Sequence, residues 1–433
     1  EREELPREVR RIHTRRENLG PLEIYSHDLF TNDIIYIDIG FDLSTLDEQE
    51  LLLLPLFAKA SYNTGLPGLT YDQLSRSLSR LTGGFGYSLE AGNTIESSPK
   101  QSQFLFFRMK TLKETVSEAL SLVKRICLEP DFSDAGRIKT LLLEMRNNLR
   151  ASLLPRGNSY AALRAAGYLS PVLSIEERWG GIEQFLFLSR QAEAYEAEVV
   201  GKKLLRMKEK IIRAEGMLLH TTAEGPLLDY TQQLFPEFLD GFPGAAQVLS
   251  GFNPISRGQD TTSVRTSEGT SDNRAASKSG HRYLSPTVKN EALISSGSVG
   301  YAASVFPAAV IGTTEYAHQS VLSHLLSTGI LWQKIRMSGG AYGASASVNG
   351  AQGLFALSSY RDPNPLLSLP VFESALQTIA QGDFSDGDLT KAIIGTVGKD
   401  SKPLGPRVEG FIGLQRKLYR ITDEMRQKKR DDI

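Results

Sequence analysis

The sequence predicts an α+β fold of two homologous domains, each a mainly antiparallel sheet with helices packed on one face. The order strand, helix, helix, Gly-Gly, strand, strand, helix can be traced twice along the chain. The glycine pair Gly83-Gly84 of the first copy returns as Gly339-Gly340, 256 residues later (339 − 83). A chain of 433 residues is also too long for one ordinary core, which favours more than one domain.

Composition narrows the class of protein. Hydrophobic residues make up 40% and charged residues 23%, as in a soluble globular protein. A net charge of −1 gives no general case for nucleic-acid or membrane binding. The single cysteine, Cys127, excludes an internal disulfide framework, and its apolar neighbours predict a buried thiol.

The ends of the chain and its apolar runs bear on location. No apolar run reaches the length of a membrane span, and the charged N-terminus is not a signal peptide. We therefore expect the cytoplasm or an organellar matrix. Because the chain starts at Glu1 without an initiator methionine, we also expect it to be cut from something longer.

The first copy is expected to follow a charged linker arm at residues 1–20 and to fill residues 21–252. Ser44 or Thr45 is expected to cap its first helix, and Thr70 with Gln73 forms a capping box for the second. The expected strands are 34–43, 85–91, 103–110 and 210–220, and the expected helices are 44–61, 70–83, 112–128 and 227–239.

Two segments interrupt the repeat. Residues 134–207 are mostly helical in pattern, with breaks near Pro155 and Pro171, and we interpret them as an all-helical insertion in the first domain. Residues 253–282 are polar and lack aliphatic side chains that could form a core, so they predict a flexible linker or loop.

The second copy is expected to fill residues 283–433. Its predicted strands are 299–310, 344–348 and 354–359, the last two separated by the turn signal Asn349-Gly350. Its predicted helices are 314–328, 331–337 and 365–380.

The most unusual stretch of the second copy joins its short helix to its strands. Arg336 and Tyr342 (Arg-x5-Tyr) flank the pair Gly339-Gly340, which can adopt backbone angles closed to other residues. One interpretation is that a cation and a phenol lie where a helix meets a sheet edge, facing an extended ligand. The alternative is a surface salt bridge and a core aromatic.

Complete catalytic motifs are missing from the sequence. The six histidines form none of the spacings that place two zinc ligands on one helix face, which favours core or surface histidines over metal ligands. There is neither a Gly-x-Ser-x-Gly elbow nor a Gly-Lys-Ser/Thr phosphate loop.

The motifs around Arg336 and Tyr342 carry a resemblance to a known family. Arg336-x5-Tyr342 around the glycines, followed by Ser359-Tyr360-Arg361-Asp362-Pro363-Asn364, resembles the last domain of the pitrilysin/insulinase-type zinc metallopeptidases, in the presequence-protease branch. The stretch Leu29 to Tyr36 resembles the start of that branch's third domain. The resemblance covers almost the whole chain, but only the C-terminal half of such an enzyme.

This resemblance implies a clamshell enclosing a chamber in which unfolded peptides are degraded. Zinc would be bound by the N-terminal catalytic half, so no metal ligands are expected here, and this chain alone would be inactive. Its expected partners are that half and the peptide, with neither nucleic acid nor membrane. The implied catalytic residues are Arg336 and Tyr342, and the implied substrate-binding residues are Gly339, Gly340, Ala341, Gly343, Arg361 and Asn364.

Two other functions stay open at this point. The same fold could serve as a non-catalytic structural or assembly subunit, which would have no reason to keep both Arg336 and Tyr342. A nucleic-acid module could use the basic residues 7–16 and 426–430, and it would bind DNA in a salt-dependent manner.

Overall fold

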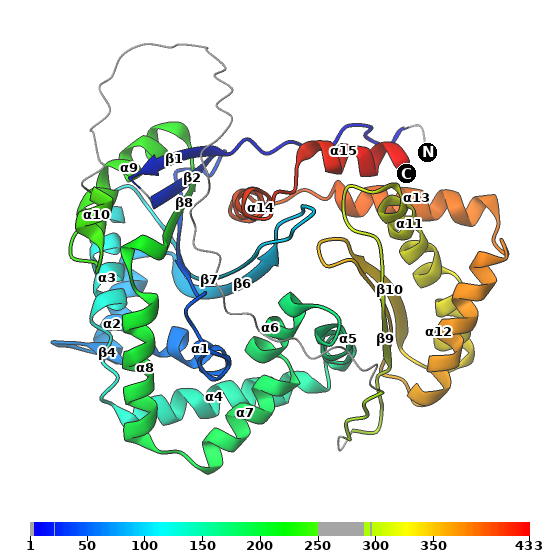
Figure 1. Ribbon diagram of the computed structural model, residues 1–433, viewed down its shortest axis with the longest axis horizontal. Helices are drawn as coiled ribbons and strands as arrows, with labels where there is room; N and C mark the ends of the chain where they lie inside the picture. The colour runs from blue at the N-terminus through cyan, green and yellow to red at the C-terminus, as the bar shows by residue number, and fades with distance from the viewer. Residues whose placement is uncertain (1–3, 21, 250–289, 295–296) are drawn as a thin grey trace, which may run out of the picture.

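The computed structural model describes residues 4–20, 22–249, 290–294 and 297–433. Figure 1 shows one large sheet on the left of the molecule and a smaller sheet on the right. The helices of residues 135–211 join the two along the bottom of the view. The C-terminal helices and the N-terminal residues join them along the top, so both chain ends lie beside the second domain.

The large sheet has six strands in the order β1-β2-β8-β3-β7-β6. Only the pair β2 and β8 is parallel, so the sheet is mainly antiparallel, as predicted. The strands are β1 (Arg15–Leu19), β2 (Leu22–Asp28), β3 (Ile35–Asp42), β6 (Gly84–Asn93), β7 (Gln101–Thr111) and β8 (Met217–Ala223).

Helices bury the apolar face of this sheet. The Thr70 capping box forms as predicted and starts α2, but α1 is capped by Asp47, whose own capping box with Glu50 outcompetes Ser44 and Thr45. Cys127 is buried in the same core. The elements are α1 (Glu48–Ala60), α2 (Tyr71–Leu81), α3 (Val116–Leu128), α9 (Gly225–Leu239) and α10 (Ala245–Leu249), with a small ribbon of β4 (Gly65–Leu66) and β5 (Leu69–Thr70).

Residues 135–211 are all-helical, close to the predicted 134–207, and break near Pro155 and Pro171. The predicted strand at 210–220 begins too early, because α8 continues to Ile211 and the strand begins only at Met217. The helices are α4 (Ala135–Leu153), α5 (Gly157–Gly167), α6 (Pro171–Gly180), α7 (Ile182–Glu193) and α8 (Ala197–Ile211).

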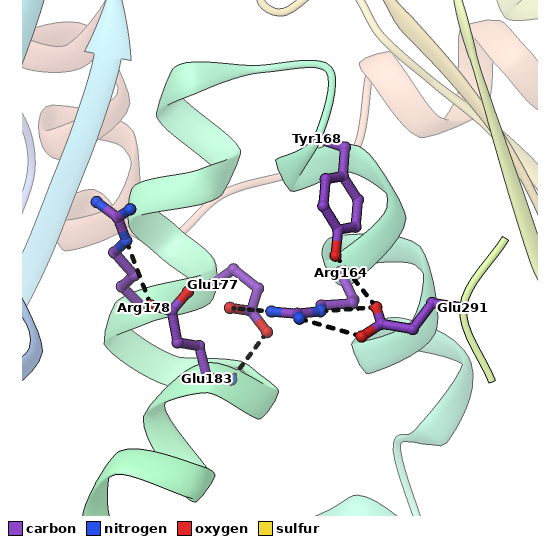
Figure 2. A network of polar contacts seen from close by, with 6 residues as sticks. All are labelled: Arg164, Tyr168, Glu177, Arg178, Glu183 and Glu291. Atoms are coloured by element: carbon purple, nitrogen blue, oxygen red, sulfur yellow. Dashed lines mark hydrogen bonds and ion pairs between the residues drawn. The ribbon is translucent and has the colours of Figure 1, made fainter. Parts of the chain in front are cut away.

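The helical segment also packs on the second domain. Leu163, Leu169 and Leu173 contact Val305 and Leu354 of the small sheet. Figure 2 shows the polar part of this junction: the Arg164 guanidinium forms paired hydrogen bonds of 2.9 and 3.1 Å with Glu291. The same guanidinium reaches the buried Glu177 at 3.4 Å. Residues 135–211 are therefore a bridge between the domains as well as part of the first.

The small sheet has the antiparallel order β10-β11-β9, from β9 (Ala303–Pro307), β10 (Gly343–Asn349) and β11 (Leu354–Tyr360). This is the same pairing as β6-β7-β3 in the large sheet, as the repeat predicts. The helix α11 (Thr314–Thr328) has the predicted bounds, and α12 (Pro365–Ala380) follows β11. The expected strand at 299–310 is shorter, since only five of its residues are in β9.

The last helices correct the predicted domain layout. The helices are α13 (Asp386–Asp400), α14 (Pro406–Leu418) and α15 (Asp423–Asp432). The side chains of Phe411 and Leu414 on α14 pack against Tyr25, Phe106 and Leu218 on the outer face of the large sheet. Helices therefore cover both faces of that sheet rather than one, and the last part of residues 283–433 packs on the first domain.

The charged N-terminal arm is likewise more than a linker. Its end forms β1, which the charged composition did not predict. Its backbone carbonyls at Pro6, Arg7 and Arg10 accept hydrogen bonds from side chains of α15. The predicted linker at 253–282 lies outside the described residues.

A buried polar chain lies under α14. His27 Nδ1 is 2.9 Å from His220 Nε2, and His220 Nδ1 is 2.8 Å from Asp38 Oδ2. Asp38 also accepts a hydrogen bond of 2.7 Å from Arg108, whose guanidinium lies 3.8 Å from the Phe411 ring centre. Burial alone would raise the pKa of Asp38, but His220 and then Arg108 hold it below its ordinary value. The two histidines are thus satisfied core residues.

Candidate functional site

Arg336 lies in a short π-helical segment, Trp332–Ser338, between α11 and β10. Such segments are rare and often occur at functional sites. Ile335 is buried and anchors the segment in the second core, which leaves the neighbouring Arg336 exposed. The helix ends where the N–H groups of Gly339 and Gly340 donate to the Arg336 carbonyl.

The two glycines are required for different reasons. A Cβ on Gly339 would lie 2.7 Å from the Ile335 carbonyl oxygen, so only glycine lets the chain pass the helix end. Gly340 has φ +79°, in the left-handed region that favours glycine. Its Cβ would have room, 3.6 Å from Pro363, so the requirement there is conformational.

Tyr342 directly precedes β10 and is 63% exposed. Its N–H donates to the Arg361 carbonyl at 3.2 Å. The Arg336 guanidinium lies 5.5 Å from its ring centre, and the Arg361 guanidinium lies 5.9 Å away. The Tyr360 ring meets it edge-on at 5.8 Å. The structure therefore brings together Arg336 and Tyr342, and excludes the alternative of a core aromatic.

The Arg-Asp-Pro-Asn turn supports the phenol from the other side. Arg361 has φ +46°, which is unusual for a residue with a side chain. Asp362 is buried and accepts hydrogen bonds from the Asn364 N–H at 2.8 Å and the Ser368 hydroxyl at 2.6 Å. Asp362 therefore fixes the turn that aims Arg361 at Tyr342.

The other predicted site residues divide into two groups. Gly343 pairs with Tyr360 in the β10–β11 register and lies beside Tyr342. The Ala341 side chain is buried in the core, and its N–H donates to the Ile335 carbonyl, so it supports the turn and does not face a ligand. Asn364 is exposed at the start of α12, on the far side of Asp362 from Tyr342.

Sequence reasoning missed two aromatic members of the cluster. The Tyr360 ring packs against Tyr342 and lies 5.9 Å from the Tyr301 ring. Partial burial and Tyr360 raise the pKa of the Tyr301 phenol, which the nearby Arg361 opposes. Counting back along both strands from the predicted Asn349-Gly350 turn could have placed Tyr360 opposite Gly343. No sequence pattern pointed to Tyr301.

This arrangement offers hydrogen-bond donors rather than a catalytic base or metal ligands. The exposed phenol and two guanidiniums suit an oxyanion or peptide carbonyl groups. Within the described residues, no three His, Cys, Asp or Glu side chains come together as a metal site. Those residues therefore do not fit the zinc that the resemblance implies, and no metal-dependent step is assigned to this chain.

Comparison with known proteins places the chain in a family. Residues 1–190 match the domain family described as associated with peptidase family M16, subfamily C, and residues 291–433 match "PreP C-terminal domain". The chain belongs to the M16 peptidases. It corresponds to the C-terminal half of the presequence-protease branch, as the motifs around Arg336 and Tyr342 predicted.

Relatives of the M16 chain are more than twice its length. It is 28% identical to presequence protease 1, chloroplastic/mitochondrial, of Arabidopsis thaliana over 99% of this chain and 37% of that protein. It is 24% identical to the mitochondrial presequence protease of Xenopus laevis over 93% of this chain and 39% of that protein. The chain therefore spans about two fifths of the curated relatives it matches.

Solved structures share the fold. The peptidase M16 inactive domain from Pseudomonas fluorescens aligns with a TM-score of 0.58 and 13% identity over 98% of this chain and 94% of that one. The periplasmic protease PqqL from Escherichia coli aligns with a TM-score of 0.55 and 13% identity over 99% of this chain and 45% of that one. A similar unit thus occurs both alone and as about half of a longer protease.

No helix in the described part of the chain has the length and apolar character needed to span a bilayer.

Proposed function

We propose that this chain is the C-terminal, substrate-binding half of a zinc metalloendopeptidase that degrades unfolded peptides in a closed chamber. The observation that carries the proposal is the exposed Arg336–Tyr342 pair, 5.5 Å from guanidinium carbon to ring centre, at the end of a π-helical segment. In the proposed enzyme, the zinc site and general base are in the N-terminal catalytic half, and this chain alone is inactive. Its compartment is the cytoplasm or an organellar matrix.

The roles of the two residues follow from their chemistry. Peptide hydrolysis builds negative charge on the scissile carbonyl oxygen, and a fixed phenol O–H stabilises that charge more as it develops. The Arg336 fork can bind neighbouring peptide carbonyl groups without reading side chains. Arg361 is within 5.9 Å of the Tyr342 ring and is a further candidate for substrate binding, together with the turn glycines Gly339, Gly340 and Gly343.

The test is Tyr342→Phe in the full-length enzyme that contains this chain. The change removes one hydroxyl, and kcat should fall about 10²–10³-fold with unchanged zinc content. Tyr71→Phe is a matched control, because Tyr71 is also exposed and also lies beneath a guanidinium, that of Arg137 at 4.1 Å. It should leave kcat unchanged.

An unchanged kcat in Tyr342→Phe would reject this role and favour the alternative, a structural or assembly subunit of the same fold. Loss of zinc in that variant would show that Tyr342 supports the metal site instead of the substrate.

A further inference from the structure

A second cluster of cations lies far from the Arg336–Tyr342 pair, where the two domains and the N-terminal arm meet. A cavity of about 390 Å³, here called the junction cavity, opens between α14, α15 and the start of α11. Figure 1 shows these elements together at the top of the molecule, with the N-terminal residues running beside α15. The lining residues are Val9, Ile311, Tyr316, Asp400, Ile412, Gln415, Arg416, Tyr419, Ile421, Arg426, Lys429 and Arg430.

The charge of this lining is unbalanced. It holds four cations, Arg416, Arg426, Lys429 and Arg430, and a single carboxylate, Asp400. Lys429 is paired with Asp400 at 2.7 Å, and Arg426 is paired with Asp423 at 2.7 Å. Arg416 and Arg430 have no such ion pair among the described residues, although Asp423 and Glu409 lie close enough to act on Arg416 electrostatically.

Both of these guanidiniums keep a buried donor without a partner. Arg430 is 9% exposed; two of its nitrogens bond to the Pro6 carbonyl and the Ser401 hydroxyl, but its Nε has no hydrogen-bond partner. On Arg416, Nη1 is likewise buried and unpartnered. Burial, and then the charge of Arg426, lowers the pKa of Arg416 to about 10. Buried donors of this kind are costly unless they are satisfied.

We propose that the junction cavity binds a phosphate group through Arg416 and Arg430. A phosphate group carries a charge between about −1.5 and −2 at neutral pH, which balances two guanidiniums, and its oxygens can accept from both unpartnered donors. Guanidinium groups match this geometry. The cavity is roomy enough for inorganic phosphate, pyrophosphate or a small phosphomonoester.

Binding there would link parts of the molecule that are distant in sequence. Arg416 is on the helix that covers the large sheet, whereas Arg430 holds the N-terminal arm and α13 through Pro6 and Ser401. A bound phosphate group would therefore stabilise the contact between the two domains, and this effect is independent of the proposed peptidase role.

The experiment titrates the full chain with inorganic phosphate and with pyrophosphate, by calorimetry and by thermal unfolding. Sodium chloride at the same ionic strength separates site binding from screening. We expect one saturable site and a higher Tm in phosphate than in chloride. A stronger effect of pyrophosphate would indicate a polyphosphate or nucleotide, and equal effects would indicate a single phosphate group.

Variants assign the site to its residues. Arg416→Gln should weaken phosphate binding at least about tenfold, because it removes a charge-assisted hydrogen bond. It should still fold, since no hydrogen bond of the described structure uses the Arg416 side chain. Arg416→Lys, which keeps the charge, should bind with intermediate affinity. Lys391→Gln is the matched control, a cation of α13 that is 79% exposed and outside the cavity.

The proposal is overturned if phosphate gives no heat and no greater Tm than chloride at matched ionic strength. It is also overturned if Lys391→Gln weakens binding as much as Arg416→Gln, because the effect would then be one of net charge. Should Arg416→Gln fail to fold, the Arg416→Lys titration and the phosphate-against-chloride comparison on the unmodified chain still decide the question.

Discussion

Arg336 and Tyr342 are oriented by residues that do not themselves face a ligand. Ile335 anchors the π-helical segment, and Asp362 fixes the turn from which Arg361 reaches the Tyr342 ring. The aromatic contact from Tyr360 adds a second restraint on the phenol. At the scale of single residues, the candidate site is therefore a pair of exposed donors held by a buried support.

His27 provides a residue-scale test of the buried polar chain. Burial, then His220 and Lys417, lowers its pKa from 6.5 to about 3. Because the folded-state pKa is below the unfolded value, the neutral form is required, and stability present above pH 6.5 is lost as the pH falls towards 3. Between pH 6 and pH 4.5 His27 alone should cost about 2 kcal/mol of unfolding free energy.

Denaturant unfolding at several pH values measures this contribution. His27→Gln should flatten the acid dependence, whereas His13→Gln, at an exposed position of the arm, should leave it as in the unmodified chain. The same acid slope in all three proteins would mean that His27 is protonated in the folded state.

Among the elements, α14 shows how a helix can approach a sheet over polar groups. A Cβ on Gly413 would lie 2.2 Å from His27 Nε2, and one on Gly410 would lie 2.0 Å from Thr222 Oγ1. The two glycines lie one turn apart and open one face of the helix to the polar chain. Phe411 and Leu414 beside them supply the apolar contact.

The Gly339-Gly340 turn is an element whose conformation can be tested directly. Gly340→Ala places a Cβ at φ +79° without a clash, so it should cost about 1–2 kcal/mol of unfolding free energy and displace Tyr342 from Arg336. In the full-length enzyme, kcat should fall while overall folding is kept. Circular dichroism and peptide hydrolysis measure the two effects.

Gly398→Ala is the control for this change. Gly398 lies in α13 with open space around it, so alanine there should stabilise by up to about 1 kcal/mol and leave kcat unchanged. If Gly340→Ala behaved in the same way, the left-handed turn would not be needed to hold the pair.

On the scale of the whole molecule, the two domains are joined along two edges. One is the helical segment, with Arg164 bound to Glu291 and the Tyr301 hydroxyl donating to the Leu154 carbonyl. The other is the N-terminal arm with α14 and α15. Joining at both edges suits a half-shell that must keep its shape against a partner half, as the proposed function requires.

The Arg10–Glu409 pair tests the second edge. Glu409 is buried, and Arg10 of the arm reaches it at 2.8 Å. Arg10→Ala leaves that carboxylate without this partner and should lower the unfolding free energy by about 1–2 kcal/mol. Arg80→Ala, in a pair with Glu118 that is exposed on both sides, should change it by less than about 1 kcal/mol. Equal effects would show that the arm adds no stability.

The sequence by itself determined the local structure and the identity of the candidate pair. Capping at Thr70, the bounds of α11 and the Gly-Gly turn each depend on a few neighbouring residues, and the repeat predicted the same three-strand order in both sheets. Its errors were local competitions, such as Asp47 replacing Ser44 and Thr45 as a helix cap.

Only the tertiary structure decided which distant segments meet. The charged arm gained a strand and partners on α15, α14 covered the opposite domain's sheet, and Tyr301 and Tyr360 joined Tyr342. Burial of apolar area rewards any complementary surface regardless of its distance along the chain, so these contacts leave no periodic pattern in the sequence. The same holds for Arg416 and Arg430, whose unpartnered donors exist only because packing brought two domains together around them.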